Sequence, residues 1–161
     1  MSAKQPIAFQ DCYPDDVAHC YGCGRLNPYG HQLKSYWDGE STVATFVPQP
    51  HHTAIPGYVY GGLIASLIDC HGTGTAAAVA GRRAGIEMSS DIELPRFVTA
   101  SLQVDYMKPT PLGPPLDLRG TVAEQTDRKV IVDVTVSAEG SVTARGRVVA
   151  VRMPEGLVAV A

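Results

Sequence analysis

Apolar and polar residues alternate along the second half of the chain. The alternation has a period of two, which is typical of strands that bury one face against a core. Turn signals such as Glu139-Gly140 separate the runs, so consecutive strands can pair as hairpins. The pattern predicts an antiparallel sheet with one buried face, built from four long strands over residues 101–106, 116–122, 130–136 and 142–150.

The region before these strands holds the most apolar segment of the chain, residues 59–81. Apolar residues recur there at helical spacing and predict one long helix over residues 61–80. Basic residues and glycines in residues 81–85 are typical of a helix C-terminus. Asp69 and His71 lie in the middle of the apolar segment, where a bilayer would penalise both. The sequence therefore disfavours a membrane-spanning helix.

Two short strands are predicted ahead of the helix, over residues 32–37 and 42–47, with an Asp38-Gly39 turn between them. An irregular arm, about residues 1–31, precedes them. The simplest way to bury both apolar surfaces is to wrap the antiparallel sheet around the long central helix. This is an α+β fold, the hotdog architecture, in a single domain over residues 1–161. Its open strand edges favour pairing of copies as a homodimer or a dimer of dimers.

Composition narrows the class of protein. Hydrophobic residues make up 45% of the 161 residues and charged residues 18%, which is typical of an ordinary globular domain. The net charge of −3 argues against a nucleic-acid partner. The first ten residues lack the apolar core of a signal peptide, and the four cysteines form no spaced framework. We therefore expect a cytoplasmic protein without a membrane or nucleic-acid partner.

The start of the predicted helix carries the features that point to chemistry. Gly61 and Gly62 leave the first backbone N–H groups free of side chains, and such donors suit a developing oxyanion. Asp69 is a lone carboxylate in an otherwise apolar helix, so it needs a partner or a function. Alternatively, Ser66 and Thr73 solvate Asp69, or it pairs with an arginine.

Helical spacing places Asp69 on one face with Gly62, Ser66, Thr73 and Ala76. This face is small and weakly polar, which leaves room for a ligand beside the carboxylate. Gly61 and Asp69 are eight residues apart, which is about 12 Å along a helix. One carbonyl group cannot touch both in the same chain. If both act on one substrate, one of them comes from a second subunit whose helix runs antiparallel.

The chain resembles the PaaI-like branch of the hotdog-fold thioesterases, in the 4-hydroxybenzoyl-CoA thioesterase superfamily. Gly61, Gly62 and Asp69 match the Gly-Gly…Asp motif of that family in type and spacing. The segment 20–30, Cys-Tyr-Gly-Cys-Gly-Arg-Leu-Asn-Pro-Tyr-Gly, is similar to its Cys-x-x-Cys-Gly…Asn-Pro-x-Gly opening. The resemblance spans roughly residues 20 to 152 and includes the strand at 98–108 followed by Pro109.

The resemblance implies hydrolysis of an acyl-CoA thioester without a metal or organic cofactor. Asp69 would attack the carbonyl or activate a water, two routes that remain open. The Gly61 N–H of the other subunit would polarise the carbonyl oxygen. A hydroxyl residue early in the next strand positions water in some relatives, and counting back from Tyr106 assigns this place to Thr99.

Two departures from the family pattern affect the substrate more than the fold. Tyr60 stands where the family has a histidine before the glycines. Ala54 stands where an asparagine often orients the substrate, and His52 is a candidate substitute if the loop shifts. With Tyr60, the other candidate substrate contacts are Gly62, Ser66 and Thr73.

Weaker signals remain open. Cys12, Cys20, Cys23 and His31 have a spacing that could close a zinc site, with His19 as another ligand, although a packed, reduced turn is the simpler interpretation. His71 is interpreted as a core or interface histidine. Two basic pairs are weak candidates for CoA phosphates: Arg128 with Lys129, and Arg82 with Arg83.

The main alternative function is a non-catalytic acyl-CoA sensor on the same fold. Asp69 favours an enzyme, because a carboxylate in an acyl pocket adds little to simple binding, whereas Tyr60 mildly favours the sensor. A hotdog hydratase is a weaker alternative, since the Asn27–His31 segment resembles only part of its motif and lies ahead of the first strand.

Overall fold

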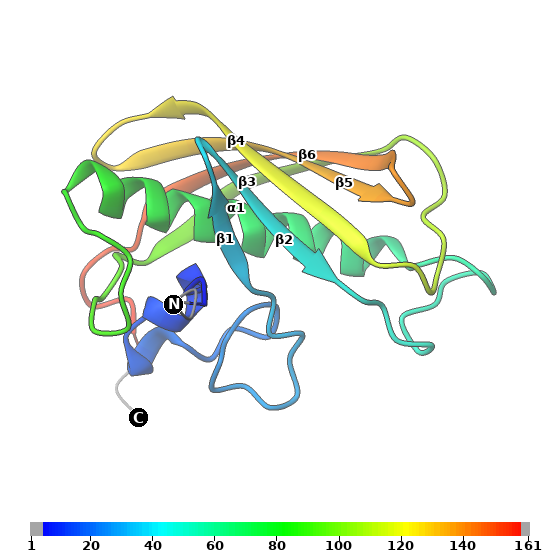
Figure 1. Ribbon diagram of the computed structural model, residues 1–161, viewed down its shortest axis with the longest axis horizontal. Coiled ribbons are helices and arrows are strands. Elements are labelled where there is room, and N and C mark those ends of the chain that lie inside the picture. The colour runs from blue at the N-terminus through cyan, green and yellow to red at the C-terminus, as the bar shows by residue number, and fades with distance from the viewer. Residues whose placement is uncertain (1–4, 159–161) are drawn as a thin grey trace.

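The computed structural model describes residues 5–158 and has one long helix and one six-stranded sheet (Figure 1). All neighbouring strands pair antiparallel, in the order β1-β2-β4-β5-β6-β3. The elements are β1 (Ser35–Asp38), β2 (Ser41–Phe46), α1 (Gly61–Arg83), β3 (Phe97–Tyr106), β4 (Leu116–Gln125), β5 (Lys129–Ala138) and β6 (Ser141–Arg152), preceded by the short 3-10 turns η1 (Phe9–Cys12) and η2 (Asp15–Val17). The predicted hotdog fold is confirmed. Residues 1–4 and 159–161 of the predicted domain lie outside the described residues.

The core lies between α1 and the concave face of the sheet. Alternate residues of β5 are fully buried, as the period of two predicts: Val130, Val132, Val134, Val136 and Ala138. They face a helix whose apolar side chains are equally buried, among them Leu63, Ile64, Leu67 and Ile68. By length and composition α1 could span a membrane, but 83% of its apolar window is buried inside the domain.

The N-terminal arm belongs to this core. Phe9, Cys12, Tyr13 and Cys23 are buried and pack in the same cluster as the helix. Figure 1 shows the arm on the side of α1 away from strands β4 to β6. The arm therefore covers the part of the helix that the sheet leaves open.

Two elements differ from their predicted form near the arm and the helix end. The first strand starts at Ser35, because Gln32 has a φ of 52° and this left-handed conformation interrupts an extended chain. The helix continues to Arg83, three residues beyond the predicted end. Its C-cap, Ala84, precedes Gly85 with a φ of 78°, where the chain turns away.

Strand β3 differs more, because it has no buried face over most of its length. The alternation of Leu102, Val104 and Tyr106 predicts that these side chains are buried, but Leu102 is 38% exposed and Tyr106 52% exposed. The reason is position: β3 is the edge of the sheet and pairs only with β6. This prediction was wrong for Leu102 and Tyr106, whereas Val104 is partly buried against the core. The exposed face lies beside the helix that carries Asp69.

Candidate active site

Asp69 lies in the middle of α1 and is half-buried. The hydroxyl of Thr99, on β3, donates a hydrogen bond to Asp69 Oδ1. Burial raises the pKa of Asp69 above its usual value, the Thr99 hydrogen bond opposes this rise, and the charges of Cys20 and Arg96 act in opposite directions. The carboxyl group is therefore less hydrated and more basic than an exposed aspartate, while one hydroxyl fixes one of its oxygens.

A β-bulge directs Thr99 toward the helix. Thr99 pairs with Ala150 and Ser101 pairs with the adjacent Val149, so Ala100 is an extra residue in β3. A bulge of this kind bends the strand and re-aims the side chains beside it. The resemblance and a count from Tyr106 single out Thr99 without any information about this bulge.

In the described residues neither Thr73 nor an arginine bonds to the Asp69 carboxylate. The Thr73 hydroxyl bonds to the main-chain carbonyls of Asp69 and Cys70, at 3.1 and 3.3 Å, and not to the carboxylate. Thr73 and Ala76 are also buried, so the expected open face is covered beyond Asp69. Within residues 5–158 no salt bridge of Asp69 with an arginine is found, although Arg96 lies close enough to influence its pKa.

Two tyrosines explain the glycine pair at the helix start. A Cβ on Gly61 would lie 3.1 Å from the Tyr106 hydroxyl, and a Cβ on Gly62 would lie 2.4 Å from Cε2 of Tyr60. The Tyr106 hydroxyl also donates to the Gly61 carbonyl oxygen at 2.7 Å. Tyr60 is the N-cap but provides no side-chain cap. The N–H groups of Gly61 and Gly62 therefore have no side-chain capping oxygen, whereas the Leu63 N–H bonds to the Tyr60 carbonyl oxygen at 3.2 Å.

The contact of Tyr106 with Gly61 is not predicted by the sequence. In the sequence Tyr106 is only the last apolar residue of an alternating strand. Burial raises its pKa, which keeps the phenol protonated as a donor to Gly61. No local pattern in the sequence shows that the end of β3 meets the beginning of α1.

His52, a candidate substrate contact in the sequence, is buried beside the start of the helix. Its ring is 8% exposed and packs against His31 and His51, with centroid distances of 5.2 and 4.4 Å. Its Nδ1 accepts the Gln49 N–H at 2.9 Å, and burial lowers its pKa. The main-chain oxygen of His52 accepts the Tyr60 N–H at 3.1 Å. His52 thus supports the helix start through its backbone.

His71 is a core histidine. Its ring nitrogens lie 2.9 Å from Ser35 Oγ and 3.1 Å from Thr42 Oγ1. The Thr42 hydroxyl also meets that of Thr75 at 2.6 Å, and the Gln10 side chain bonds to Ser35. Complete burial lowers the pKa of His71 to about 4. A neutral imidazole therefore joins the arm, the first hairpin and the helix.

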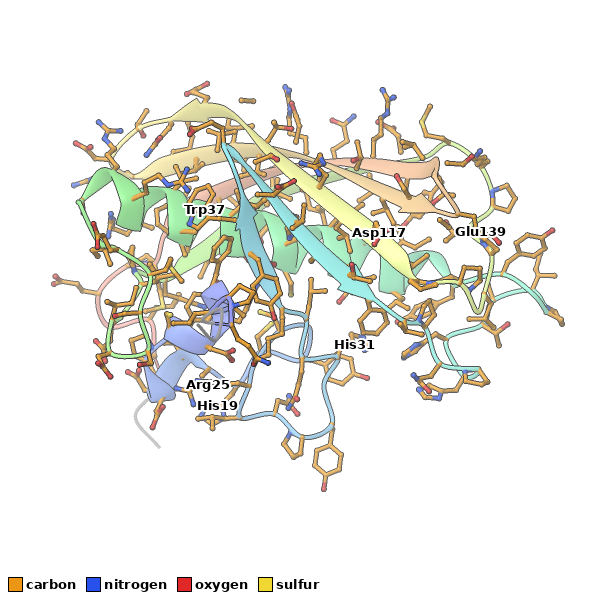
Figure 2. All side chains as sticks on the ribbon, in the orientation of Figure 1. His19, Arg25, His31, Trp37, Asp117 and Glu139 are labelled. Carbon is orange, nitrogen blue, oxygen red and sulfur yellow. The ribbon has the colours of Figure 1, made fainter. Side chains whose placement is uncertain are left out.

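Two of the four residues in the alternative zinc set, Cys12 and His31, do not join the other two. The Cys12 thiol faces the Ser89 carbonyl oxygen at 3.8 Å, and the His31 ring packs against Tyr21 and Phe46. Figure 2 shows His31 beneath β2, well away from His19 and Arg25 in the arm.

Cys20 and Cys23 instead meet Cys70 of the helix. The three sulfurs lie within 4.8 Å of one another. All four cysteines are free thiols.

The two basic pairs lie at the opposite end of α1 from Gly61. Arg83 pairs with Asp127 of the β4–β5 turn at 3.2 Å, and Lys129 pairs with Glu124 at 2.8 Å. The Arg82 guanidinium stacks over Trp37, 3.2 Å from the ring centre. Arg128 is exposed in the same turn. The C-terminal end of the helix and this turn thus form one basic region, held partly by internal ion pairs.

A family model described as the thioesterase superfamily matches residues 56–145, more than half of the chain. A thioesterase superfamily protein from Shewanella loihica PV-4 is 52% identical, with a TM-score of 0.67 over 87% of this chain and 98% of that one. The chain therefore belongs to the thioesterase superfamily, and the resemblance to PaaI-like hotdog thioesterases is confirmed.

More distant structures share the fold. The PaaI protein of the phenylacetic acid degradation operon of E. coli is 15% identical, with a TM-score of 0.61 over 77% of this chain and 81% of that one. AziG from S. sahachiroi is 19% identical, with a TM-score of 0.64 over 80% and 98% of the two chains. The comparison with curated proteins found no match.

Proposed function

We propose that the protein is a cytoplasmic acyl-CoA thioesterase that hydrolyses its substrate to a free acid and CoA. Membership in the thioesterase superfamily supports the reaction class. The observation that carries the proposal is the Asp69–Thr99 pair: a half-buried carboxylate whose hydration is reduced, with one oxygen fixed by a hydroxyl. Such a group can attack a thioester carbonyl or remove a proton from water, and both routes need the ionised form.

The second catalytic element is the free N–H of Gly61 from a partner subunit. It would donate to the carbonyl oxygen as negative charge develops there, with the helix dipole adding to the effect. The eight-residue separation, about 12 Å along α1, supports a site shared between two antiparallel helices. The one-sided pairing of β3 and its exposed Leu102 support an interface along this edge.

The substrate lies, in this proposal, against the exposed beginning of α1. Tyr60 is 40% exposed and, with Gly62 and Ser66, is a candidate contact for the acyl group. Thr73 and the His52 ring are buried, so we leave them out of the acyl pocket. Arg128 and Lys129 are proposed to meet CoA phosphates, with Arg128 the more available because Lys129 is paired with Glu124. Hydrolysis by this route needs no cofactor.

The alternative, an acyl-CoA sensor, keeps the same pocket without turnover. Tyr60 in place of the family histidine favours it, because one imidazole is missing from the site. The pairing of Thr99 with Asp69 favours the enzyme, because a sensor gains nothing from a fixed carboxylate beside the thioester.

The deciding experiment measures CoA release with a thiol reagent over short, medium, long and aryl acyl-CoAs. Aryl substrates are included because E. coli PaaI comes from a phenylacetic acid degradation operon. The Asp69→Asn variant keeps the size of the side chain and removes its charge. We expect turnover of at least one class, lost by about 100-fold or more in the variant. Acyl-CoA binding by calorimetry without turnover of any class would establish the sensor instead.

A further inference from the structure

A cluster of three thiols joins the arm to the central helix beside the proposed active site. Cys20 and Cys23 lie in the arm, and Cys70 is the helix residue that follows Asp69. Cys23 and Cys70 are buried, and Cys20 is half-buried. The sulfurs of Cys20 and Cys70 are 3.8 Å apart, and all three lie within 4.8 Å of one another.

These separations fit a shared metal ion better than a disulfide. With Zn–S bonds of about 2.3 Å, a regular tetrahedron holds its sulfurs about 3.8 Å apart. A disulfide would need a separation of about 2.05 Å and would leave the third thiol unused. Free thiols are weak donors and acceptors, so three of them gain little from meeting in a buried place.

The arm is shaped to present two of the sulfurs to the helix. Gly24 N–H donates to the Cys20 carbonyl oxygen at 2.7 Å, which closes the turn between the two cysteines. A Cβ on Gly22 would lie 2.3 Å from Cys70 Sγ, so only glycine allows this backbone to approach the helix thiol. The thiols of Cys23 and Cys70 lower the pKa of Cys20, whereas contact with Cys20 and burial raise the pKa values of Cys23 and Cys70. These contacts favour ionisation of one thiol, and a bound metal ion would displace the protons of the other two.

The surroundings can balance the charge of a bound cation and its ligands. Three thiolates and one divalent ion leave a single negative charge. Arg96 supplies a positive charge that acts on all three sulfurs, and its guanidinium stacks on Tyr13, 4.5 Å from the ring centre. Among residues 5–158, the Tyr13 hydroxyl is one of two buried side-chain polar atoms that lack a hydrogen-bond partner. It lies in the same electrostatic environment as the cluster.

We propose that Cys20, Cys23 and Cys70 bind one Zn²⁺ ion through their three sulfurs, and that this ion clamps the arm to α1 next to Asp69. The role is structural and does not depend on the proposed hydrolysis. Soft thiolate ligands in tetrahedral geometry select zinc over the hard divalent cations.

Metal analysis of the protein, purified without chelator or affinity metal, tests the proposal directly. We expect one zinc per chain in the wild type and its loss in Cys20→Ser, Cys23→Ser and Cys70→Ser. Cys12→Ser is the matched control, because this buried thiol lies apart from the cluster and the variant should keep its zinc. Retention of zinc in all three cluster variants, or loss of zinc in Cys12→Ser, would contradict the assignment.

A cobalt titration of the metal-free wild type keeps the test valid if a variant fails to fold. Co²⁺ should give intense visible bands of a tetrahedral site and a thiolate charge-transfer band, saturating at one ion per chain and disappearing when Zn²⁺ is added. A wild type that carries no metal and gives no such spectrum would overturn the proposal. A disulfide between any two of the three cysteines in the purified protein, found by peptide mapping, would also overturn it.

Discussion

The Tyr106 hydroxyl donates a hydrogen bond to the carbonyl oxygen of Gly61 at 2.7 Å, joining the last residue of β3 to the first residue of α1. Near the other end of the same strand, Thr99 bonds to the Asp69 carboxylate. One edge strand therefore contacts the helix at both positions to which the proposed chemistry is assigned.

The Thr99 hydroxyl can be removed with little change in volume. We expect Thr99→Val to lower kcat/KM by about 10- to 100-fold, because a hydrogen bond to a charged group contributes about 1.5–3 kcal/mol. Thr99→Ser keeps the hydroxyl and should retain most of the activity. The test is the kcat/KM of each variant with the acyl-CoA that the wild type hydrolyses fastest. Equal values for the Val and Ser variants would remove Thr99 from the proposed site.

Gly61→Pro tests the shared site, because proline at the first helical position lacks the N–H and suits a helix start. Tyr60, with φ −71° and ψ 143°, already has the extended backbone that must precede proline. Alone, this variant and Asp69→Asn should both be inactive. Refolded together in equal amounts, they should recover about a quarter of the wild-type activity, because half of the dimers are mixed and each has one intact site. Gly61→Ala, which keeps the N–H, is the control for added bulk, and a mixture without recovery would show that Gly61 and Asp69 do not form one site across the dimer.

The Gly62 and Tyr60 positions should be energetically coupled. Gly62→Ala places a methyl group 2.4 Å from the Tyr60 ring, so the ring must move and stability should fall. In a Tyr60→Ala background the ring that would meet the added methyl group is absent, and we expect the same change to cost at least about 0.5 kcal/mol less. Urea unfolding of the four proteins in this cycle measures the coupling. If the stability changes of the two single variants add up to that of the double variant, the Tyr60 ring is not the reason for a glycine at position 62.

The buried His71 predicts acid sensitivity. Burial lowers the pKa of His71 from 6.5 to about 4. Between these pH values the histidine is protonated in the unfolded chain and neutral in the folded protein, so acid favours unfolding. The contribution of His71 to the free energy of unfolding is complete above pH 6.5. It declines by an amount on the order of 3 kcal/mol as the pH falls from 6.5 to about 4. His71→Gln should lower stability at pH 7 by breaking contacts with Ser35 and Thr42, yet depend less on pH in this window. Parallel pH slopes for the two proteins, measured by urea unfolding, would contradict this account.

Much of the fold could be predicted because the spacing of apolar residues along the sequence follows which side chains are buried. The four β runs and the helix follow directly from where apolar residues recur, and Val130 to Ala138 show the cleanest agreement. The two errors in the predicted strands have structural causes. Gln32 is left-handed, which shortens the first strand, and β3 is an edge strand on which Leu102 and Tyr106 stay exposed in one chain.

The site was less predictable, because its contacts join distant segments. Gly61 and Asp69 share one helix, so spacing alone related them. The approach of Tyr106 to Gly61 and of Cys70 to Cys20 depends on the path of the chain, which no local pattern records. Cys12 shows the converse error, since a regular spacing in sequence grouped it with thiols that it does not meet.

Strand β3 also has a dynamic consequence. It pairs on one side only, so within a single chain its amides should open more readily than those of the central strands. Because Thr99 and Tyr106 both belong to it, fraying of this one strand would release the carboxylate and the helix start together. The fraction of molecules with an assembled site is then set by a local opening equilibrium. Hydrogen exchange of the β3 amides would report this equilibrium while the rest of the fold remains intact.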